Sequence, residues 1–168
     1  FSYWELPPAD DRSTISEKEA SGELRRLMTQ AVRRRMISDV PLGLFLSGGI
    51  DSSIVCGLMA GISDKPVETF SIGFKEASFD ETSYARCVAQ AFATHHHERI
   101  LYASECADIL PDVVSRMDVP MADASVAPTW LLSKVTREKV TVALGGDGSD
   151  ELWAGYEHYI GFALAQKY

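Results

Sequence analysis

Residues 42–53 read LGLFLSGGIDSS, and this stretch decides the fold. A short apolar run ends abruptly in Gly48 and Gly49, and apolar residues then return at helical spacing from Ile54 to Met59. A glycine turn between an extended apolar run and an apolar helix is typical of a strand that passes directly into a helix. The stretch therefore predicts a β-strand, a tight turn and an α-helix in succession.

The same order of strand, turn and helix recurs along the chain. Further strands are predicted at 67–74, 97–102 and 140–144, and helices at about 80–92, from about 104, and after the GGDGSDE stretch. Four such units predict a three-layer α/β fold, because right-handed crossovers between parallel strands place helices on both faces of the sheet. Ligands of such sheets gather at the carboxyl ends of the strands, where strand order reverses. Both glycine-rich turns lie at carboxyl ends.

The first part of the chain divides into two segments. Residues 1–15 are rich in Pro and Asp without periodicity, which indicates a linker or entry arm. Ser16 and Glu19 have the spacing of a capping box, and apolar residues follow at helical intervals up to about Ile37. A helix is expected there, and the folded domain is expected to span residues 16–168.

Composition limits the classes of function. The chain has 168 residues, 46% of them hydrophobic, and a formal net charge of -8, which disfavours nucleic-acid binding and favours a small polar ligand. No stretch is apolar enough for a membrane span, and the first residues lack the pattern of a signal peptide, so a cytoplasmic location is expected. The cysteines have no CxxC spacing and are expected to be reduced thiols of the core; they are Cys56, Cys87 and Cys106.

The first glycine turn has the chemistry of an anion site. Glycines let the backbone approach a ligand, and the N-terminus of the following helix offers free N–H groups to a phosphate. Ser47, Ser52 and Ser53 add hydroxyl donors, but no Lys-Ser or Lys-Thr pair follows as in a Walker A loop. Asp51 would repel a phosphate unless a cation such as Mg²⁺ lay between them. The turn therefore predicts a phosphate site that needs a metal ion.

These residues carry a family resemblance. SGGIDSS resembles the pyrophosphate-binding loop of the ATP pyrophosphatases (PP-loop proteins), which adenylate a substrate and release pyrophosphate. FDETSYA, DVPMADASVAPTWLLSK and VTVALGGDGSDELWAGY are similar in order and spacing to the synthetase domain of glutamine-hydrolysing asparagine synthetases, over nearly all of residues 30 to 160. The resemblance implies a Rossmann-like fold of the adenine nucleotide alpha hydrolase type.

The second turn, GGDGSDE at 145–151, crowds Asp147, Asp150 and Glu151 together. Such crowding is repulsive unless a cation is bound, although a solvated acidic turn that supports the next helix is the alternative. If the fourth strand lies beside the first, Asp51 and Asp150 face each other across one crevice and can hold one Mg²⁺. Three adjacent histidines, His95–His97, alternate in direction on an extended chain, so they are expected to begin a strand and not to bind a metal.

The resemblance assigns roles to individual residues. It places Leu46 and Ile72 beside the adenine, Gly146 near the nucleotide, Asp51 and Asp150 as Mg²⁺ ligands, and the following residues around the pyrophosphate: Ser47, Gly48, Gly49, Asp51 and Ser52. Asp147 and Glu151 are the candidate catalytic residues. Asp147 stands where well-known members carry glutamate, and Gly145 where some carry serine. These two departures leave the identity of the acceptor substrate open.

The implied activity is ATP-dependent amide formation. The side-chain carboxylate of aspartate would be adenylated, with AMP and pyrophosphate as products, and ammonia from glutamine would complete asparagine. The resemblance also implies ATP and Mg²⁺ as cofactors, a glutaminase domain on the N-terminal side and a homodimer as one assembly. Since the family's N-terminal cysteine and downstream lysine have no counterpart here, the chain is expected to be a fragment truncated at both ends. Two alternatives remain open: a related amidotransferase that acts on another carboxylate or amine, and a nucleotide-binding module without catalysis.

Overall fold

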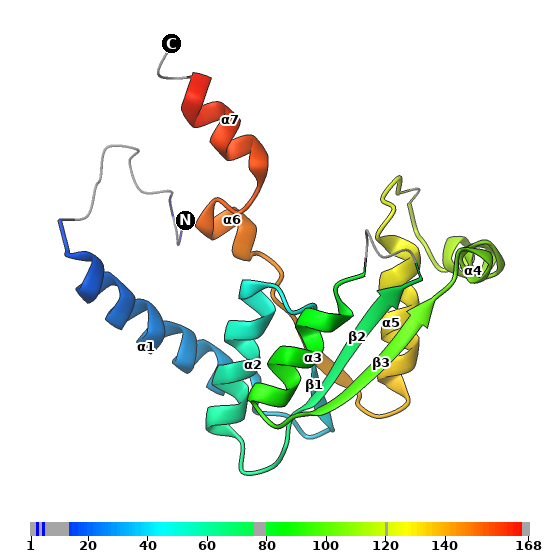
Figure 1. Ribbon diagram of the computed structural model, residues 1–168, viewed down its shortest axis with the longest axis horizontal. Coiled ribbons are helices and arrows are strands. Elements are labelled where there is room, and N and C mark those ends of the chain that lie inside the picture. Colours follow the sequence, from blue (N-terminus) through cyan, green and yellow to red (C-terminus); the bar gives the residue numbers. More distant parts are fainter. Residues whose placement is uncertain (1–2, 4, 6–13, 76–79, 120, 166–168) are drawn as a thin grey trace.

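Four parallel strands form one sheet in the order β3-β2-β1-β4 (Figure 1). The computed structural model describes residues 3, 5, 14–75, 80–119 and 121–165. The strands are β1 (Leu42–Phe45), β2 (Glu68–Phe74), β3 (His95–Leu101) and β4 (Val142–Leu144). The predicted parallel α/β architecture is confirmed. The predicted entry arm falls mostly outside the described residues.

Helices connect the strands and follow the last one. They are α1 (Glu17–Arg35), α2 (Ile50–Ile62), α3 (Thr82–Ala91), α4 (Ala103–Ser115), α5 (Val126–Arg137), α6 (Ser149–Trp153) and α7 (Glu157–Ala165). The capping box predicted for α1 is present, with Ser16 and Glu19 each bonding the backbone N–H of the other. The predictions from strand spacing did not include α5, which adds a second helix between β3 and β4.

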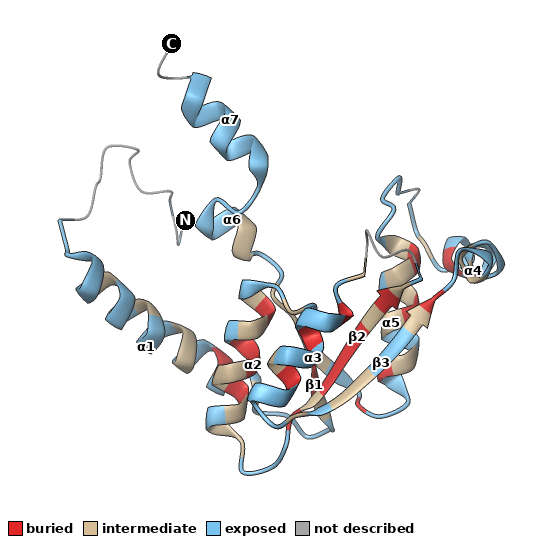
Figure 2. Ribbon diagram, in the orientation of Figure 1, coloured by how far each residue is buried: buried red, intermediate tan, exposed pale blue. Residues whose placement is uncertain are grey.

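The two central strands, β1 and β2, bury side chains on both faces of the sheet. Leu44 and Leu46 lie on one face, in a buried cluster that includes Met59 of α2 and Ala85 of α3. Phe45 points to the other face, where it lines a recess with residues of α4 and α5. Figure 2 shows the buried residues gathered where helices meet the central strands. The alternation of side chains along β1 therefore explains why helices cover both faces.

The chain reverses direction across the sheet between β1 and β4. From β1 it moves outward to β2 and β3, and it then returns to pair β4 with the free side of β1, with Leu44 opposite Leu144. The condition on which the shared crevice was predicted, that the fourth strand lies beside the first, is therefore met. Such a reversal leaves a crevice at the carboxyl ends of the two strands, where ligands of open α/β sheets bind.

Two details differ from the predictions. The third strand begins at His95, two residues earlier than expected, because His95 pairs with Glu68 in the ladder. Cys56 is buried as predicted, whereas the prediction that all three thiols belong to the core is wrong for Cys87, which is exposed on α3.

Neither α6 nor α7 contains a buried residue, and α7 extends away from the sheet (Figures 1 and 2). In the part of the chain that the structure describes, no helix is both long and apolar enough to cross a bilayer.

Candidate functional site

A cavity of about 550 Å³ opens at the carboxyl ends of β1, β2 and β4. Its wall combines the glycine turn after β1, the turn after β4, the end of β2, and residues of α3 and α5. The sequence-predicted site residues in its lining are Leu46, Ser47, Gly49, Asp51, Ser52, Ile72, Gly146, Asp147, Asp150 and Glu151. The fold thus brings both glycine-rich turns to one place.

Serine hydroxyls hold the first turn in shape. The hydroxyls of Ser47 and Ser52 lie 3.0 Å apart, and the amide of Gly49 donates to the Ser47 oxygen at 3.1 Å. Ser53, predicted as a ligand donor, is not among the cavity-lining residues and donates its hydroxyl to the Gly49 carbonyl at 2.6 Å. The loop serines therefore use some of their hydrogen bonds to stabilise the backbone of the turn itself.

Backbone amides at the start of α2 are the free donors of this turn. Gly49 is the N-cap of α2, and the first helical hydrogen bond runs from the Ser53 amide to the Gly49 carbonyl. Among the described residues, the amides of Ile50, Asp51 and Ser52 have no acceptor. Such amides, together with the positive end of the helix dipole, are suited to bind an anion.

Gly48 serves the packing of the turn and does not line the cavity. Its backbone adopts φ of +87°, which residues with a side chain rarely adopt. A Cβ on Gly48 would lie 2.5 Å from the carbonyl carbon of Tyr84 and 2.6 Å from its Cβ. The missing side chain lets the turn lie directly against the first turn of α3.

The second turn packs against the first. A Cβ on Gly146 would lie 3.0 Å from both the Asp51 Cβ and the Ser52 nitrogen, so the turn after β4 touches the start of α2. A Cβ on Gly145 would overlap a carboxylate oxygen of Asp147, so that carboxylate folds back over Gly145. Two acidic turns therefore meet at one crevice with their backbones in contact.

Asp51 and Asp150 approach the crevice from different elements. Both line the main cavity, and both also line a neighbouring recess between α1, α2 and α6. Within the described ranges, no group of three or more His, Cys, Asp or Glu side chains is arranged to hold a metal ion. Asp51 and Asp150 are the residues of this crevice that could hold a Mg²⁺ ion, because this ion usually binds with phosphates through one or two carboxylates and completes its coordination with phosphate oxygens and water.

Tyr156 contacts one of the candidate catalytic residues. Its hydroxyl donates a hydrogen bond of 2.7 Å to Oε1 of Glu151. This bond holds the pKa of Glu151 below its ordinary value and raises the pKa of Tyr156 to about 12. Sequence reasoning missed Tyr156, since it lies beyond the acidic cluster and its contact depends on the chain folding back after α6.

Other lining residues were also missed. They are mainly aromatic or hydroxyl-bearing: Phe45, Phe70, Ser71, Phe74, Thr82 and Thr129. Phe70 and Phe74 share the side of β2 that carries Ile72, and their period of two was the available signal. Thr129 was out of reach because α5 was not predicted.

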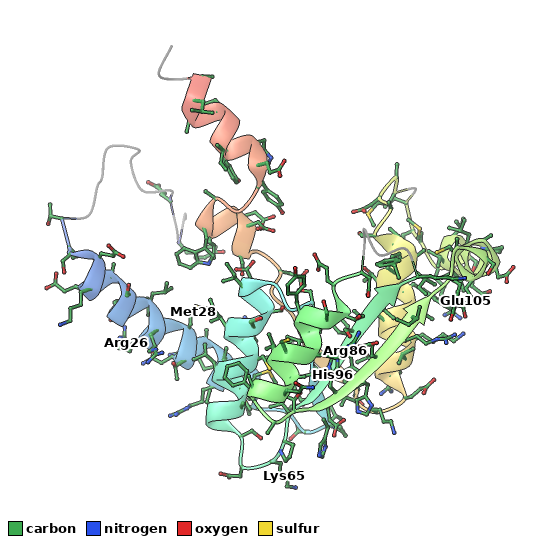
Figure 3. All side chains as sticks on the ribbon, viewed as in Figure 1. Arg26, Met28, Lys65, Arg86, His96 and Glu105 are labelled. Atoms are coloured by element: carbon green, nitrogen blue, oxygen red, sulfur yellow. The ribbon has the colours of Figure 1, made fainter. Side chains whose placement is uncertain are left out.

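The three histidines lie in β3, and the expectation that they begin a strand is confirmed. His95 and His97 both contact the carboxylate of Glu68, with distances of 3.0 and 2.6 Å. The His96 ring points to the opposite face, where it contacts the hydroxyls of Thr69 and Ser71. Figure 3 labels His96 and Arg86 on the side of the sheet that α3 covers. The three histidines therefore link β3 to side chains of β2 on both faces of the sheet.

Comparison with known proteins shows what the chain is similar to. The asparagine synthase family model matches residues 23–166. A putative glutamine-hydrolysing asparagine synthetase 2 of Methanocaldococcus jannaschii is 40% identical over 166 residues, which is 98% of this chain and 32% of that protein. The glutamine-hydrolysing asparagine synthetase 1 of Bacillus subtilis is 37% identical over 82% of this chain and 22% of that protein. The chain therefore spans a third or less of the length of these relatives.

Solved structures share the fold at low sequence identity. An NH3-dependent NAD synthetase from Campylobacter jejuni matches with a TM-score of 0.50 and 17% identity, over 84% of this chain and 61% of that one. An NMN synthetase from Francisella tularensis matches with a TM-score of 0.51 and 16% identity, over 84% and 59% of the two chains. At such identity the likeness supports the architecture alone.

Proposed function

The chain belongs to the asparagine synthase family, and from this premise we propose that its cavity binds ATP with Mg²⁺ and activates a carboxylate for amide formation. The substrate best supported is the side-chain carboxylate of aspartate, with ammonia derived from glutamine as the nucleophile and asparagine as the product. One observation carries the proposal: the crevice between β1 and β4 combines free helix amides with two carboxylates from separate turns. That combination suits a triphosphate bound with a divalent cation.

The start of α2 binds the departing group. The amides of Ile50, Asp51 and Ser52 are preorganised at the helix N-terminus, so they stabilise negative charge without further reorganisation. Asp51 and Asp150 would hold Mg²⁺ against the phosphate oxygens. When bound, Mg²⁺ neutralises the charge that accumulates on pyrophosphate as it leaves.

Apolar side chains in the cavity lining suit the adenine. Leu46 and Ile72 line the cavity together with Phe70 and Phe74, and such groups exclude water from a flat aromatic ring. These groups would hold the adenine while the turns hold the phosphates. Positioning of the α-phosphorus between these two anchors supplies much of the expected acceleration.

Asp147 and Glu151 would act on the second half of the reaction. A substrate carboxylate oxygen attacks the α-phosphorus, pyrophosphate departs, and an acyl-adenylate forms. Ammonia then attacks the acyl carbon, AMP departs, and the amine loses a proton. Both carboxylates line the cavity, and we assign them as acceptors for that proton and for the N–H groups of ammonia.

One observation favours a second candidate substrate. The Asp147 carboxylate folds over Gly145, so this part of the cavity is lined by a short acidic side chain beside a residue with no side chain. Such a lining leaves room for a carboxylate substrate other than free aspartate. The alternative is therefore a related amidotransferase that acts on a different carboxylate or amine.

For the whole protein, the proposal also includes a glutaminase domain, a homodimer and a cytoplasmic location.

Exchange of labelled pyrophosphate into ATP tests the activity. The full-length protein should catalyse exchange that depends on a carboxylate substrate, and free aspartate should be compared with other carboxylates. Exchange with aspartate alone supports asparagine synthesis, and exchange with another carboxylate alone supports the related amidotransferase. Absence of exchange with every carboxylate, in a protein that still binds ATP, supports the module without catalysis.

Two substitutions test the proposed metal site. Asp51→Asn and Asp150→Asn should each lower the affinity for Mg²⁺-ATP by more than about 10-fold while changing the affinity for metal-free ATP far less, because the parent carboxylates repel the bare nucleotide. Asp64→Asn is the matched control, since Asp64 is an exposed residue between α2 and β2 at the other end of the sheet. An equal loss with and without Mg²⁺, measured by calorimetry, would count against shared metal binding.

A further inference from the structure

The helix that carries Asp150 and Glu151 has little packing of its own. The α6 helix spans five residues, Ser149–Trp153, and none of them is buried. A short exposed helix cannot hold its side chains by core contacts. Something outside the helix must therefore set the direction of its two cavity-lining carboxylates.

The chain folds back on α6 immediately after it ends. Ala154 adopts φ of 56° and ψ of 42°, a left-handed conformation that is unusual for a residue with a side chain. The amide of Gly155 then donates to the Asp150 carbonyl at 3.0 Å. The segment 154–156 is therefore a closed turn that returns toward the start of α6.

Gly155 lies directly against the carboxylate of Asp150. A Cβ at this position would overlap Oδ1 of Asp150 and would lie 3.0 Å from its Cγ and 3.2 Å from its Cα. The carboxylate occupies the space that any side chain at position 155 would need. Contact with the bare glycine backbone therefore restricts the direction of the Asp150 carboxylate.

Tyr156 does the same for Glu151 through a hydrogen bond. Its hydroxyl donates to Oε1 of Glu151 at 2.7 Å, which leaves the second carboxylate oxygen for other partners. The Tyr156 ring stacks on His158, with centroids 5.2 Å apart and planes inclined by 15°, and it also contacts Tyr159 at 6.0 Å. These ring contacts hold the phenol in place while its hydroxyl orients the carboxylate.

We propose that the turn Ala154–Tyr156 is a positioning element for the site, in which Gly155 aims Asp150 at the metal and Tyr156 aims Glu151 at the reacting groups. The inference rests on the proposed function of the cavity and adds Gly155 and Tyr156 to it. Neither residue reacts; each acts through the carboxylate beside it. Catalytic constellations need such support, because a misplacement of about 1 Å costs on the order of 100-fold in rate.

Two substitutions with matched controls separate the two contacts in the full-length protein. Gly155→Ala adds a methyl group against Asp150, and its control is Gly161→Ala, where a Cβ meets nothing within 4 Å. Tyr156→Phe removes only the hydroxyl, and its control is Tyr159→Phe, which keeps the ring contact with Tyr156 and likewise removes only a hydroxyl. The fold should survive all four changes, since α6 and α7 contain no buried residue; circular dichroism checks this.

The expected effects differ between the two contacts. Gly155→Ala should weaken Mg²⁺-ATP binding by about 10- to 100-fold and leave metal-free ATP binding unchanged, as expected for a residue that supports a metal ligand. Tyr156→Phe should lower kcat by about 10- to 100-fold with little change in the KM for ATP, because it affects the reacting end alone. The two control variants should match the parent protein.

Double substitutions decide whether each residue acts through its carboxylate. Gly155→Ala should have no further effect in an Asp150→Asn background, and Tyr156→Phe none in a Glu151→Gln background. Full additive losses there, or losses equal to those of the controls, would overturn the inference while the proposed function stands. If Asp150→Asn and Glu151→Gln themselves changed nothing, the proposed function would fail and the inference with it.

Discussion

Replacing Gly48 by alanine should destabilise the fold, whereas replacing its neighbour Gly49 should not. The two glycines are adjacent in the same turn but have different surroundings. Gly48 has φ of +87° and touches the backbone of α3, while Gly49 has φ of -65° and a Cβ there would meet only the Ser47 hydroxyl, at 3.3 Å. The pair therefore separates a glycine needed for folding from one expected to be needed for binding.

The magnitude follows from two costs at Gly48. A left-handed conformation costs a residue with a Cβ about 1–2 kcal/mol. The new Cβ would also lie 2.5 Å from the Tyr84 carbonyl carbon, so the first turn of α3 must shift, and overpacking of this kind costs about 1–3 kcal/mol. The sum of about 2–5 kcal/mol corresponds to a fall in Tm of about 4 to 20 °C for a domain of this size.

The assay compares Gly48→Ala with Gly49→Val in urea unfolding and in ATP calorimetry. Gly48→Ala should lower the free energy of unfolding with little change in the denaturant slope. Gly49→Val should leave that free energy within about 1 kcal/mol of the parent, because an extended backbone accepts valine. The branched side chain would, however, fill the approach to the α2 amides, so ATP binding should become undetectable.

Two results would refute this reasoning. A Gly48→Ala protein as stable as the parent would show that the turn does not need its left-handed conformation. A Gly49→Val protein that is folded and binds ATP with unchanged affinity would remove the first turn from the nucleotide site.

The remaining predictions concern protonation and thiol reactivity. Burial holds the pKa of His96 below its ordinary value of 6.5, so the unfolded chain binds the proton more readily, and the free energy of unfolding should fall as pH drops below about 6.5. His96→Gln should flatten this dependence in urea unfolding at a series of pH values, and an unchanged slope would contradict the assignment. Burial also raises the pKa of the Cys56 thiol to about 11, so iodoacetamide at pH 8 should modify the exposed Cys87 at least about 100-fold faster, as peptide mass spectrometry would show. Comparable rates in the native protein would mean that Cys56 is reached by solvent.

The sequence alone predicted those features that depend on neighbours along the chain. The glycine pair after the apolar run at 42–46 marked a strand, a turn and a helix, since each of these is governed by local backbone freedom and by the spacing of apolar residues. The capping box at Ser16 was visible for the same reason. The helix at Val126–Arg137 was not predicted, although Ala127 and Leu131 are buried at helical spacing. Pro128 and the polar residues just before the helix weaken the helical pattern of the local sequence.

Tertiary structure alone decided which of these elements meet. Several strand orders satisfy the local pattern equally well, and β4 lies beside β1 because that pairing brings Leu144 against the buried cluster around Leu44. Only this long-range pairing brings the turn that carries Asp51 to the turn that carries Asp150. The contact of Tyr156 with Glu151 likewise depends on the left-handed turn at Ala154, a conformation that alanine rarely adopts and that no local propensity indicates.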